Sequence, residues 1–125
     1  MDREAVETWV ADYERLWRQP GTDRLGELFT TDAAYRPSPW VQVLEGVEAI
    51  AAFWEAERVG PDEEFTMSSD VVAMDGNTVV VRVFVEYGAA GGPLWRDLWV
   101  LEFAEDGRCL SFEEWPFAPD QADGH

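Results

Sequence analysis

Apolar side chains near the start of the chain recur at steps of three and four, which is the spacing of an amphipathic helix. These positions are Val6, Trp9, Val10, Tyr13, Leu16 and Trp17. The pattern predicts a helix from Glu4 to Trp17. A second, shorter helix is expected to be capped by Thr22 or Asp23 and to run through Phe29, packing against the first as a helical hairpin.

Extended chain and a third helix are predicted next. Residues 32–37 are expected to be extended, because the prolines at 37 and 39 disfavour helix in the residues before them. Gly46 is expected to open a third helix that Gly60-Pro61 closes. Beyond it, apolar and polar residues alternate with the period of a β-strand in four segments, 64–74, 78–87, 94–103 and 108–116. Turns that contain glycine are expected to join these strands as an antiparallel meander.

These elements predict one α+β domain over residues 1–118, in which N-terminal helices cover a curved, mainly antiparallel sheet. Residues 119–125 are expected to form a flexible acidic tail. The N-terminal residues lack the apolar stretch of an export signal, and no apolar run is long enough to cross a bilayer. A cytoplasmic location is therefore expected.

Alternation along the four strands assigns their side chains to two faces of the sheet. With regular hairpins, one face gathers acids, an arginine and aromatic rings: Phe65, Met67, Ser69, Val71, Val80, Arg82, Phe84, Glu86, Trp95, Asp97, Trp99, Leu101, Phe103, Ser111, Glu113 and Trp115. The other face is rich in valine and includes Val72, Val79, Val81, Val83, Val85, Tyr87, Leu98, Val100, Leu110 and Phe112. The helices can cover only one face, so a homodimer is predicted through the Val-rich face.

Composition narrows the chemistry. The net charge of −17 disfavours nucleic acid and anionic membrane as partners, and it suits uncharged or cationic small ligands. The chain has no Lys, which excludes Schiff-base chemistry, and its single His, His125, makes a His-based triad or a multi-histidine metal site improbable. No metal and no cofactor are expected. Cys109 is interpreted as a small buried hydrophobe rather than a catalytic thiol, since it has no His partner.

Four short motifs occur in an order typical of a known family. They are Leu28-Phe29-Thr30-Thr31-Asp32-Ala33, Gly46-Val47-Glu48-Ala49-Ile50, Asp106-Gly107-Arg108 and Glu114-Trp115-Pro116-Phe117. In these, the chain resembles the nuclear-transport-factor-2-like superfamily, particularly its SnoaL-like branch. The resemblance implies a cone, in which the helices and the curved sheet enclose a pocket. It also implies functions that range from isomerases, dehydratases and epoxide hydrolases to non-catalytic binding proteins, so it specifies fold rather than activity.

The resemblance assigns the charged and aromatic face to the pocket. Asp97, Arg82 and Glu113 are then candidate catalytic residues, an arrangement similar to the epoxide hydrolases of the superfamily, which bridge two carboxylates with an arginine. The alternative is a structural ion pair between Asp97 and Arg82. Tyr13 matches the position of the hydrogen-bond donor in the steroid isomerases, or it is simply part of the core. Pro37 replaces the base of those enzymes and Trp99 their second acid, which argues against classical ketosteroid isomerisation.

Aromatic and acidic side chains are expected to line the rest of the pocket and to favour a small apolar or aromatic ligand. They are Trp40, Trp54, Phe84, Glu86, Trp95, Trp99 and Trp115. The predicted function is a small-molecule pocket protein, and acid/base catalysis without a cofactor is one hypothesis for it. The alternative is a non-catalytic dimerising or ligand-binding module, and the sequence does not decide whether the protein is an enzyme.

Overall fold

A computed structural model describes residues 1–58, 63–88 and 92–121 of the chain. The elements in chain order are α1 (Arg3–Arg18), the 3-10 turn η1 (Leu25–Glu27), β1 (Phe29–Arg36), β2 (Leu44–Glu45), α2 (Val47–Glu57), β3 (Phe65–Asp75), β4 (Thr78–Tyr87), β5 (Leu94–Phe103) and β6 (Cys109–Phe117). The α+β class and the mainly antiparallel sheet are confirmed. None of the helices in the described residues has the length and apolar character needed to cross a membrane.

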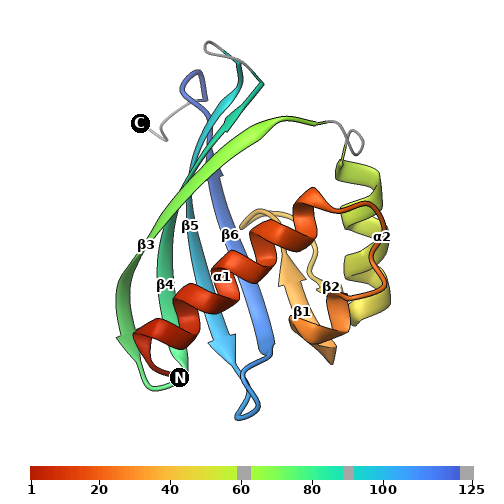
Figure 1. The fold of residues 1–125 in the computed structure, drawn as a ribbon, viewed down its shortest axis with the longest axis vertical. Coiled ribbons are helices and arrows are strands. Elements are labelled where there is room, and N and C mark those ends of the chain that lie inside the picture. The colour runs from red at the N-terminus through yellow and green to blue at the C-terminus, as the bar shows by residue number, and fades with distance from the viewer. Residues whose placement is uncertain (59–62, 89–91, 122–125) are drawn as a thin grey trace.

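The six strands form one sheet in the order β2-β1-β6-β5-β4-β3. All neighbours are antiparallel except β1 and β6, which run parallel. In Figure 1, α1 crosses one face of the curved sheet, and α2 stands beside it against β1 and β2. The predicted meander corresponds to β3 to β6, and β1 and β2 extend it along the free edge of β6.

The first predicted helix is confirmed as α1. Asp2 caps it, because its carboxylate accepts a hydrogen bond from the backbone N–H of Ala5 at 2.8 Å. The apolar face predicted for this helix is the buried one: Val6, Trp9, Val10, Tyr13 and Leu16 lie against the sheet. Tyr13 therefore lies between α1 and the strands of the sheet.

The predicted second helix is shorter than expected. Only Leu25–Glu27 form a 3-10 turn, and Phe29 begins β1 instead of ending a helix, so the helical hairpin was a wrong prediction. The parallel pairing with β6 accounts for this, since the Cys109 N–H donates to the Leu28 carbonyl at 2.7 Å. The extended chain predicted for residues 32–37 falls mostly within β1.

The third predicted helix is α2, and it follows Gly46 as expected. Gly46 has a φ of 93°, a conformation that favours glycine, and its N–H donates to the Ala33 carbonyl at 2.8 Å. A side chain there would also approach the Thr31 carbonyl. The predicted end at Gly60-Pro61 lies outside the described residues, and the helix itself ends at Glu57.

A β-bulge in β3 changes the faces predicted for β4. Near the turn, Ala73 lies opposite Val80, but the next pair is Val71 with Val81, so Val72 is an extra residue with no partner. A regular hairpin would have placed Val71 opposite Arg82. The bulge moves the register by one residue, which reverses the facing of β4 relative to β3. The β4–β5 register, with Val83 opposite Asp97, also differs from the predicted one.

A second bulge changes β6 in the same way. Phe103 lies opposite Cys109, but the neighbouring pair is Glu102 with Ser111, so Leu110 is the extra residue. Trp99 therefore lies opposite Glu114, whereas a regular register would have placed it opposite Glu113. On β6, the acid on the helix-covered side is therefore Glu114, the neighbour of the predicted Glu113.

The residues predicted for the Val-rich face are divided between the two sides of the sheet. Val79, Val81 and Val83 are fully buried under α1 together with Trp99 and Phe112, whereas Leu98 is exposed on the opposite side, across from Arg82. The predicted homodimer cannot form through the β4 valines, because α1 already covers them. We call this helix-covered side of the sheet the inner face and the opposite side the outer face.

Candidate functional site

The inner face carries a pocket where α1, α2 and the strands come together. The pocket has a volume of about 240 Å³, at the small end of the range of ligand sites. Its walls are mostly aromatic and apolar, and they comprise Tyr13, Trp17, Tyr35, Pro37, Phe53, Glu57, Phe65, Met67, Val85, Tyr87, Trp95, Asp97, Trp99, Glu114 and Pro116. A small, mainly apolar molecule would fit such a space.

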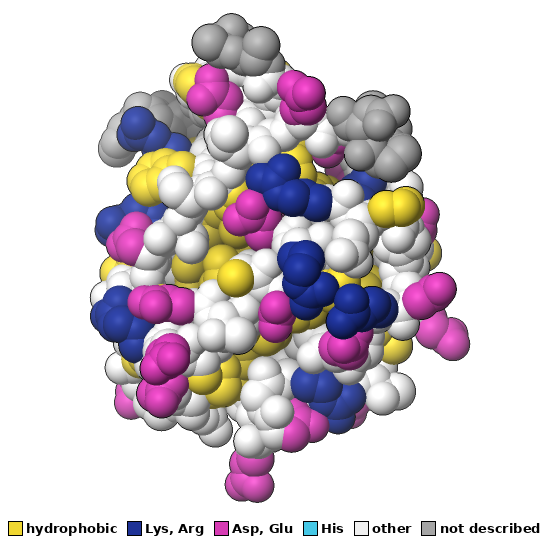
Figure 2. Space-filling model, viewed as in Figure 1, with side chains coloured by type: hydrophobic (Ala, Val, Ile, Leu, Met, Phe, Trp, Pro, Cys, Tyr) yellow, Lys and Arg dark blue, Asp and Glu magenta, His cyan; other side chains and the backbone are white. Residues whose placement is uncertain are grey.

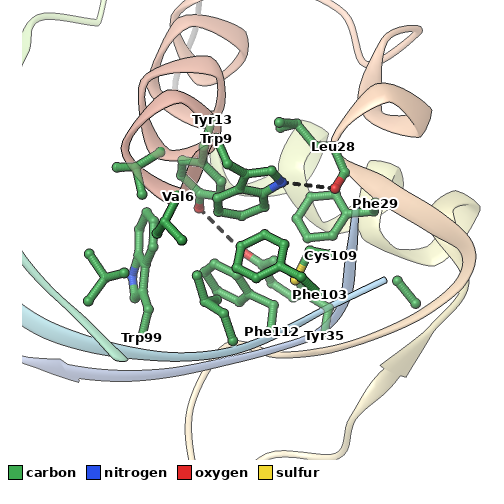
Figure 3. Packing of buried hydrophobic residues seen from close by; sticks show 14 of the residues in the cluster. Val6, Trp9, Tyr13, Leu28, Phe29, Tyr35, Trp99, Phe103, Cys109 and Phe112 are labelled. Atoms are coloured by element: carbon green, nitrogen blue, oxygen red, sulfur yellow. Dashed lines mark hydrogen bonds between the residues drawn. The ribbon is translucent and has the colours of Figure 1, made fainter. Parts of the chain in front are cut away.

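Tyr13 reaches the pocket from α1, as expected. Its hydroxyl lies 3.5 Å from that of Tyr35 on β1, and the ring of Tyr13 stacks on Phe112 (Figure 3). Burial raises the pKa of Tyr13 well above its usual range, and the nearby Tyr35 and Glu114 add to the shift. Tyr13 therefore stays protonated and can donate a hydrogen bond to an oxygen in the pocket.

Asp97 projects from β5 into the same pocket. Its side chain is a buried charge, with only 6% of the residue exposed, and its Oδ1 atom has no hydrogen-bond partner in the described residues. Burial raises the pKa of Asp97, and interactions with Glu114, the backbone of Phe117 and the Trp99 indole partly offset that rise. An unpartnered buried oxygen is costly unless a ligand or water meets it.

Glu114 lies beside Asp97 on the neighbouring strand. Asp97 is opposite Pro116 in the β5–β6 register, so Glu114 is its diagonal neighbour on the inner face. Burial raises the pKa of Glu114 well above its ordinary value of 4.5, and the Asp97 carboxyl raises it further. The two side chains form a carboxyl pair in which Glu114 is the member that holds a proton.

A carboxyl pair of this kind supplies an acid and a base from one wall of a pocket. Two nearby carboxyls cannot both ionise easily, so one proton is kept at neutral pH. The unpartnered Oδ1 of Asp97 is then the basic site, and the proton on Glu114 is the acidic one. Both can act on a molecule held by the aromatic walls.

Aromatic side chains enclose the carboxyl pair. Trp99 packs at 4.6 Å from Tyr13 and 5.0 Å from Phe112, measured between ring centroids (Figure 3). Its buried indole nitrogen has no hydrogen-bond partner in the described residues. Trp95 and Tyr87 form another part of the wall. Trp95 and Trp99 both line the pocket, and their predicted part in ligand binding stays a prediction.

Several other predicted site residues lie on the outer face. Arg82 forms an ion pair with Asp70, with 3.4 Å between Nη1 and Oδ2, and it cannot bridge carboxylates in the pocket. Glu113 accepts a hydrogen bond from the Trp115 indole at 2.8 Å. The registers of β4 and β6 differ from the predicted ones, and a bulge contributes to each difference. The predicted site residues that point away from the pocket for this reason are Arg82, Phe84, Glu86, Glu113 and Trp115.

Two further tryptophans do not line the pocket either. Trp40 follows β1 and is 97% exposed. Trp54 is fully buried on α2, where its ring meets the edge of Tyr13 at 5.0 Å. It belongs to the core behind the pocket, so it positions Tyr13 without facing a ligand.

The sequence contained one signal for the missed acid. Phe112 and Glu114 are two residues apart on β6, so they must share a face, and a buried Phe112 carries Glu114 inward with it. Tyr35 and Glu57 were also missed, because they reach the pocket from β1 and α2, outside the four predicted strands.

The environment of Cys109 is that of a core residue. Cys109 is fully buried, as interpreted, and burial raises the pKa of its thiol to about 12. Its Sγ lies 3.1 Å from the Ser111 carbonyl. No three His, Cys, Asp or Glu side chains in the described part of the chain lie close enough together to hold a metal ion.

Comparison with known proteins is consistent with this geometry. The profile of the SnoaL-like domain family matches residues 10–112. SalBIII, an epoxide hydrolase/cyclase-like enzyme with a role in pyran ring formation in the polyether salinomycin, has a similar structure, with a TM-score of 0.71, 20% sequence identity and 93% of each chain covered. A steroid delta-isomerase from Pseudomonas aeruginosa gives a TM-score of 0.64 and 20% identity, over 94% of this chain and 82% of its own. No curated protein sequence matches the chain significantly.

Proposed function

Since this chain belongs to the SnoaL-like domain family, we propose that it binds a small, mostly apolar molecule and performs acid/base chemistry on it without a cofactor. The reaction would be of the isomerase, dehydratase or hydrolase type. The observation that carries the proposal is the pair of Asp97 and Glu114 in an aromatic pocket, with one carboxylate oxygen left unpartnered.

Each polar group of the pocket has a role in this proposal. Asp97 takes a proton from the ligand, or from a water that attacks it, through the free Oδ1. Glu114 returns a proton to the oxygen that leaves or forms. Tyr13 donates a hydrogen bond to a ligand oxygen, because its raised pKa keeps the hydroxyl protonated.

The structural relatives support a pocket of this general type but not one reaction. One is an epoxide hydrolase/cyclase-like enzyme and another a steroid isomerase, and both are only 20% identical to this chain. Among the described residues, no arginine lines the pocket, so two carboxylates bridged by an arginine are not part of the proposal.

A thermal-shift screen of small apolar and aromatic compounds tests the proposal. Ligands that stabilise the wild type should stabilise Asp97→Asn and Glu114→Gln less, while Glu113→Gln should behave as the wild type. A compound that is also converted should lose its turnover in both pocket variants. Equal shifts in all four proteins would contradict a role for the pair.

A non-catalytic binding protein is the alternative. In that case Asp97→Asn and Tyr13→Phe would change affinity alone, and no compound in the screen would be converted by the wild type. Product analysis by mass spectrometry on every stabilising compound separates the two functions. Conversion that depends on Asp97 would decide for the enzyme.

We also propose that a second copy covers the outer face. Apolar side chains are exposed there, including Phe84, Leu98, Trp115 and Phe117. Charges of both signs lie among them, such as Arg96 and Glu86, so a copy related by a two-fold axis can bring opposite charges together.

Light scattering tests this assembly. A dimer has twice the mass of 14.2 kDa, and Phe84→Asp combined with Leu98→Asp should give the monomer without loss of the far-UV circular dichroism spectrum. A monomeric wild type at high micromolar concentration would overturn the assembly and leave the pocket proposal unaffected.

A further inference from the structure

We infer that the pocket selects a positively charged ligand: a protonated amine on a small aromatic or alicyclic body, with its nitrogen beside Asp97 and Glu114. This inference rests on the proposed function and specifies its ligand class. It follows from the charge, the aromatic walls and one unpartnered oxygen of the site.

The charged groups of the pocket wall are acidic. Glu57, Asp97 and Glu114 face the space, and no Arg, Lys or His is among the described residues that line it. The Oδ1 atom of Asp97 is buried and lacks a hydrogen-bond partner in the described chain. An ammonium N–H is the donor that such an atom accepts most strongly, because the bond is charge-assisted.

Aromatic rings complete a site for a cation. Trp17, Phe65, Tyr87 and Trp95 belong to the same wall, and the faces of such rings attract a positive charge. The protein already uses one of these rings in this way, since the Arg18 guanidinium lies 3.8 Å from the centroid of Phe65.

The arginines near the pocket are held elsewhere. Arg18 pairs with Glu14 at 2.8 Å and donates to the Phe65 carbonyl at 2.9 Å. Arg58 pairs with Glu55 at 2.7 Å and donates to the Gly21 carbonyl at 2.9 Å. Neither lines the pocket, so its carboxyls have no internal cation to neutralise them.

Charge on the rest of the molecule acts in the same direction. The chain has 26 acidic and nine basic residues, so its net field is negative, although on the face that carries α1 acidic and arginine side chains lie side by side (Figure 2). A cation is attracted by such a field, whereas a carboxylate or phosphate ligand is repelled. A neutral apolar ligand would fit the walls but would leave the Asp97 oxygen without a partner.

Three matched probes test the ligand class by calorimetric titration in about 0.15 M salt, which screens the surface charge. They are N-methylbenzylammonium, its uncharged analogue benzyl methyl ether, and the anion phenylacetate. We expect the ammonium to bind about tenfold more tightly than the ether, a difference in the range of desolvated cation–π and charge-assisted contacts. Phenylacetate should not bind measurably.

Variants locate the effect in the pocket. Asp97→Asn should reduce the ratio of ammonium to ether affinity several-fold. Glu113→Gln removes a carboxylate from the outer face, so it should leave the ratio unchanged. The indole N–H signal of Trp95 should shift in nuclear magnetic resonance spectra, and that of Trp115 should not.

The outcomes separate this inference from the proposed function. If the ether binds as tightly as the ammonium and Asp97→Asn weakens both, the cation preference is wrong and the pocket function stands. If Glu113→Gln lowers the ratio as much as Asp97→Asn, the attraction is a property of the surface and the inference is overturned. If none of the three probes binds and no compound stabilises the wild type in the thermal-shift screen, both proposals fail.

Discussion

Glu113 and Glu114 are neighbours on one strand, and they have different environments. Glu113 lies on the outer face, where it accepts a hydrogen bond from Trp115 and lies 3.9 Å from Arg36. Glu114 lies on the inner face beside Asp97, where burial raises its pKa. The same carboxyl group is therefore on the outer surface at Glu113, whereas at Glu114 it is buried and retains its proton more strongly.

The difference extends to the whole sheet. The inner face carries the pocket, the core and the carboxyl pair, whereas the outer face carries solvent-exposed ion pairs such as Arg82 with Asp70. Two inserted residues, Val72 and Leu110, decide which side chains belong to which face. The environment of each side chain in this sheet is thus set by the strand register.

The largest contrast is expected between two tryptophans. Trp99→Ala on the inner face should lower the free energy of unfolding by about 3–5 kcal/mol, because Trp99 is buried among aromatic rings. Trp115→Ala on the outer face should cost about 1 kcal/mol or less. Urea denaturation measures both, and Trp99→Phe gives a milder inner-face change if the alanine variant does not fold. Equal losses would contradict the assignment of the faces.

The adjacent glutamates give the next effect, and it depends on pH. The folded-state pKa of Glu114 lies above its unfolded value near 4.5, so the folded chain holds this proton more tightly and loses stability as pH rises above that value. Glu114→Gln removes this loss. It should therefore stabilise the protein by about 1–3 kcal/mol at pH 8 and change stability little at pH 4.

Glu113→Gln is the control for that experiment. It removes one carboxylate from the outer face of a chain whose net charge is −17, so its stability curve gives the general effect of losing one acidic side chain. The difference between their stability curves isolates the buried site. Parallel curves from pH 4 to pH 8 would show that Glu114 is not buried with Asp97.

A smaller effect is expected from the inner tyrosine. Tyr13→Phe removes one hydroxyl that lies 3.5 Å from the Tyr35 hydroxyl and keeps the ring in place. The free energy of unfolding should fall by about 0.5–1.5 kcal/mol. Thermal unfolding followed by circular dichroism measures this change, and an increase in stability would indicate that the hydroxyl is not satisfied in the pocket.

The smallest effect is expected for an outer-face ion pair. Arg82→Ala breaks the contact with Asp70 between two half-exposed side chains, so stability should change by about 0.5 kcal/mol or less. Pocket binding should not change at all. A loss of ligand affinity in this variant would restore Arg82 as a pocket residue.

The sequence predicted the fold better than the site. The spacing of apolar residues located α1 and the four long strands, and the predicted membership of the SnoaL-like branch of the nuclear-transport-factor-2-like superfamily is confirmed. Tyr13, Asp97, Trp95 and Trp99 line the pocket, and their roles there stay predictions. The alternation of side chains between the two faces depends only on the sequence of one strand, so it can be recognised without knowing how the strands pair.

The faces of β4 and β6 could not be predicted in the same way. A β-bulge depends on how two strands pair, and neither Val72 nor Leu110 is a residue type that marks one. One unrecognised insertion reverses every later side chain of the paired strand, so Arg82 and Glu113 were assigned to the pocket and Glu114 to the other face. The burial of Phe112 and of the valines identifies the correct choice.

The position of β6 has a consequence for how the protein is made. The last strand of the chain lies between β5 and β1 in the interior of the sheet, and its parallel partner β1 is separated from it by most of the sequence. These long-range pairings can form only after Phe117 has left the ribosome. Asp97 is therefore synthesised before the pocket wall around it is complete. Only when β6 has been made can it pair with β1 and β5 and place Glu114 beside that carboxylate.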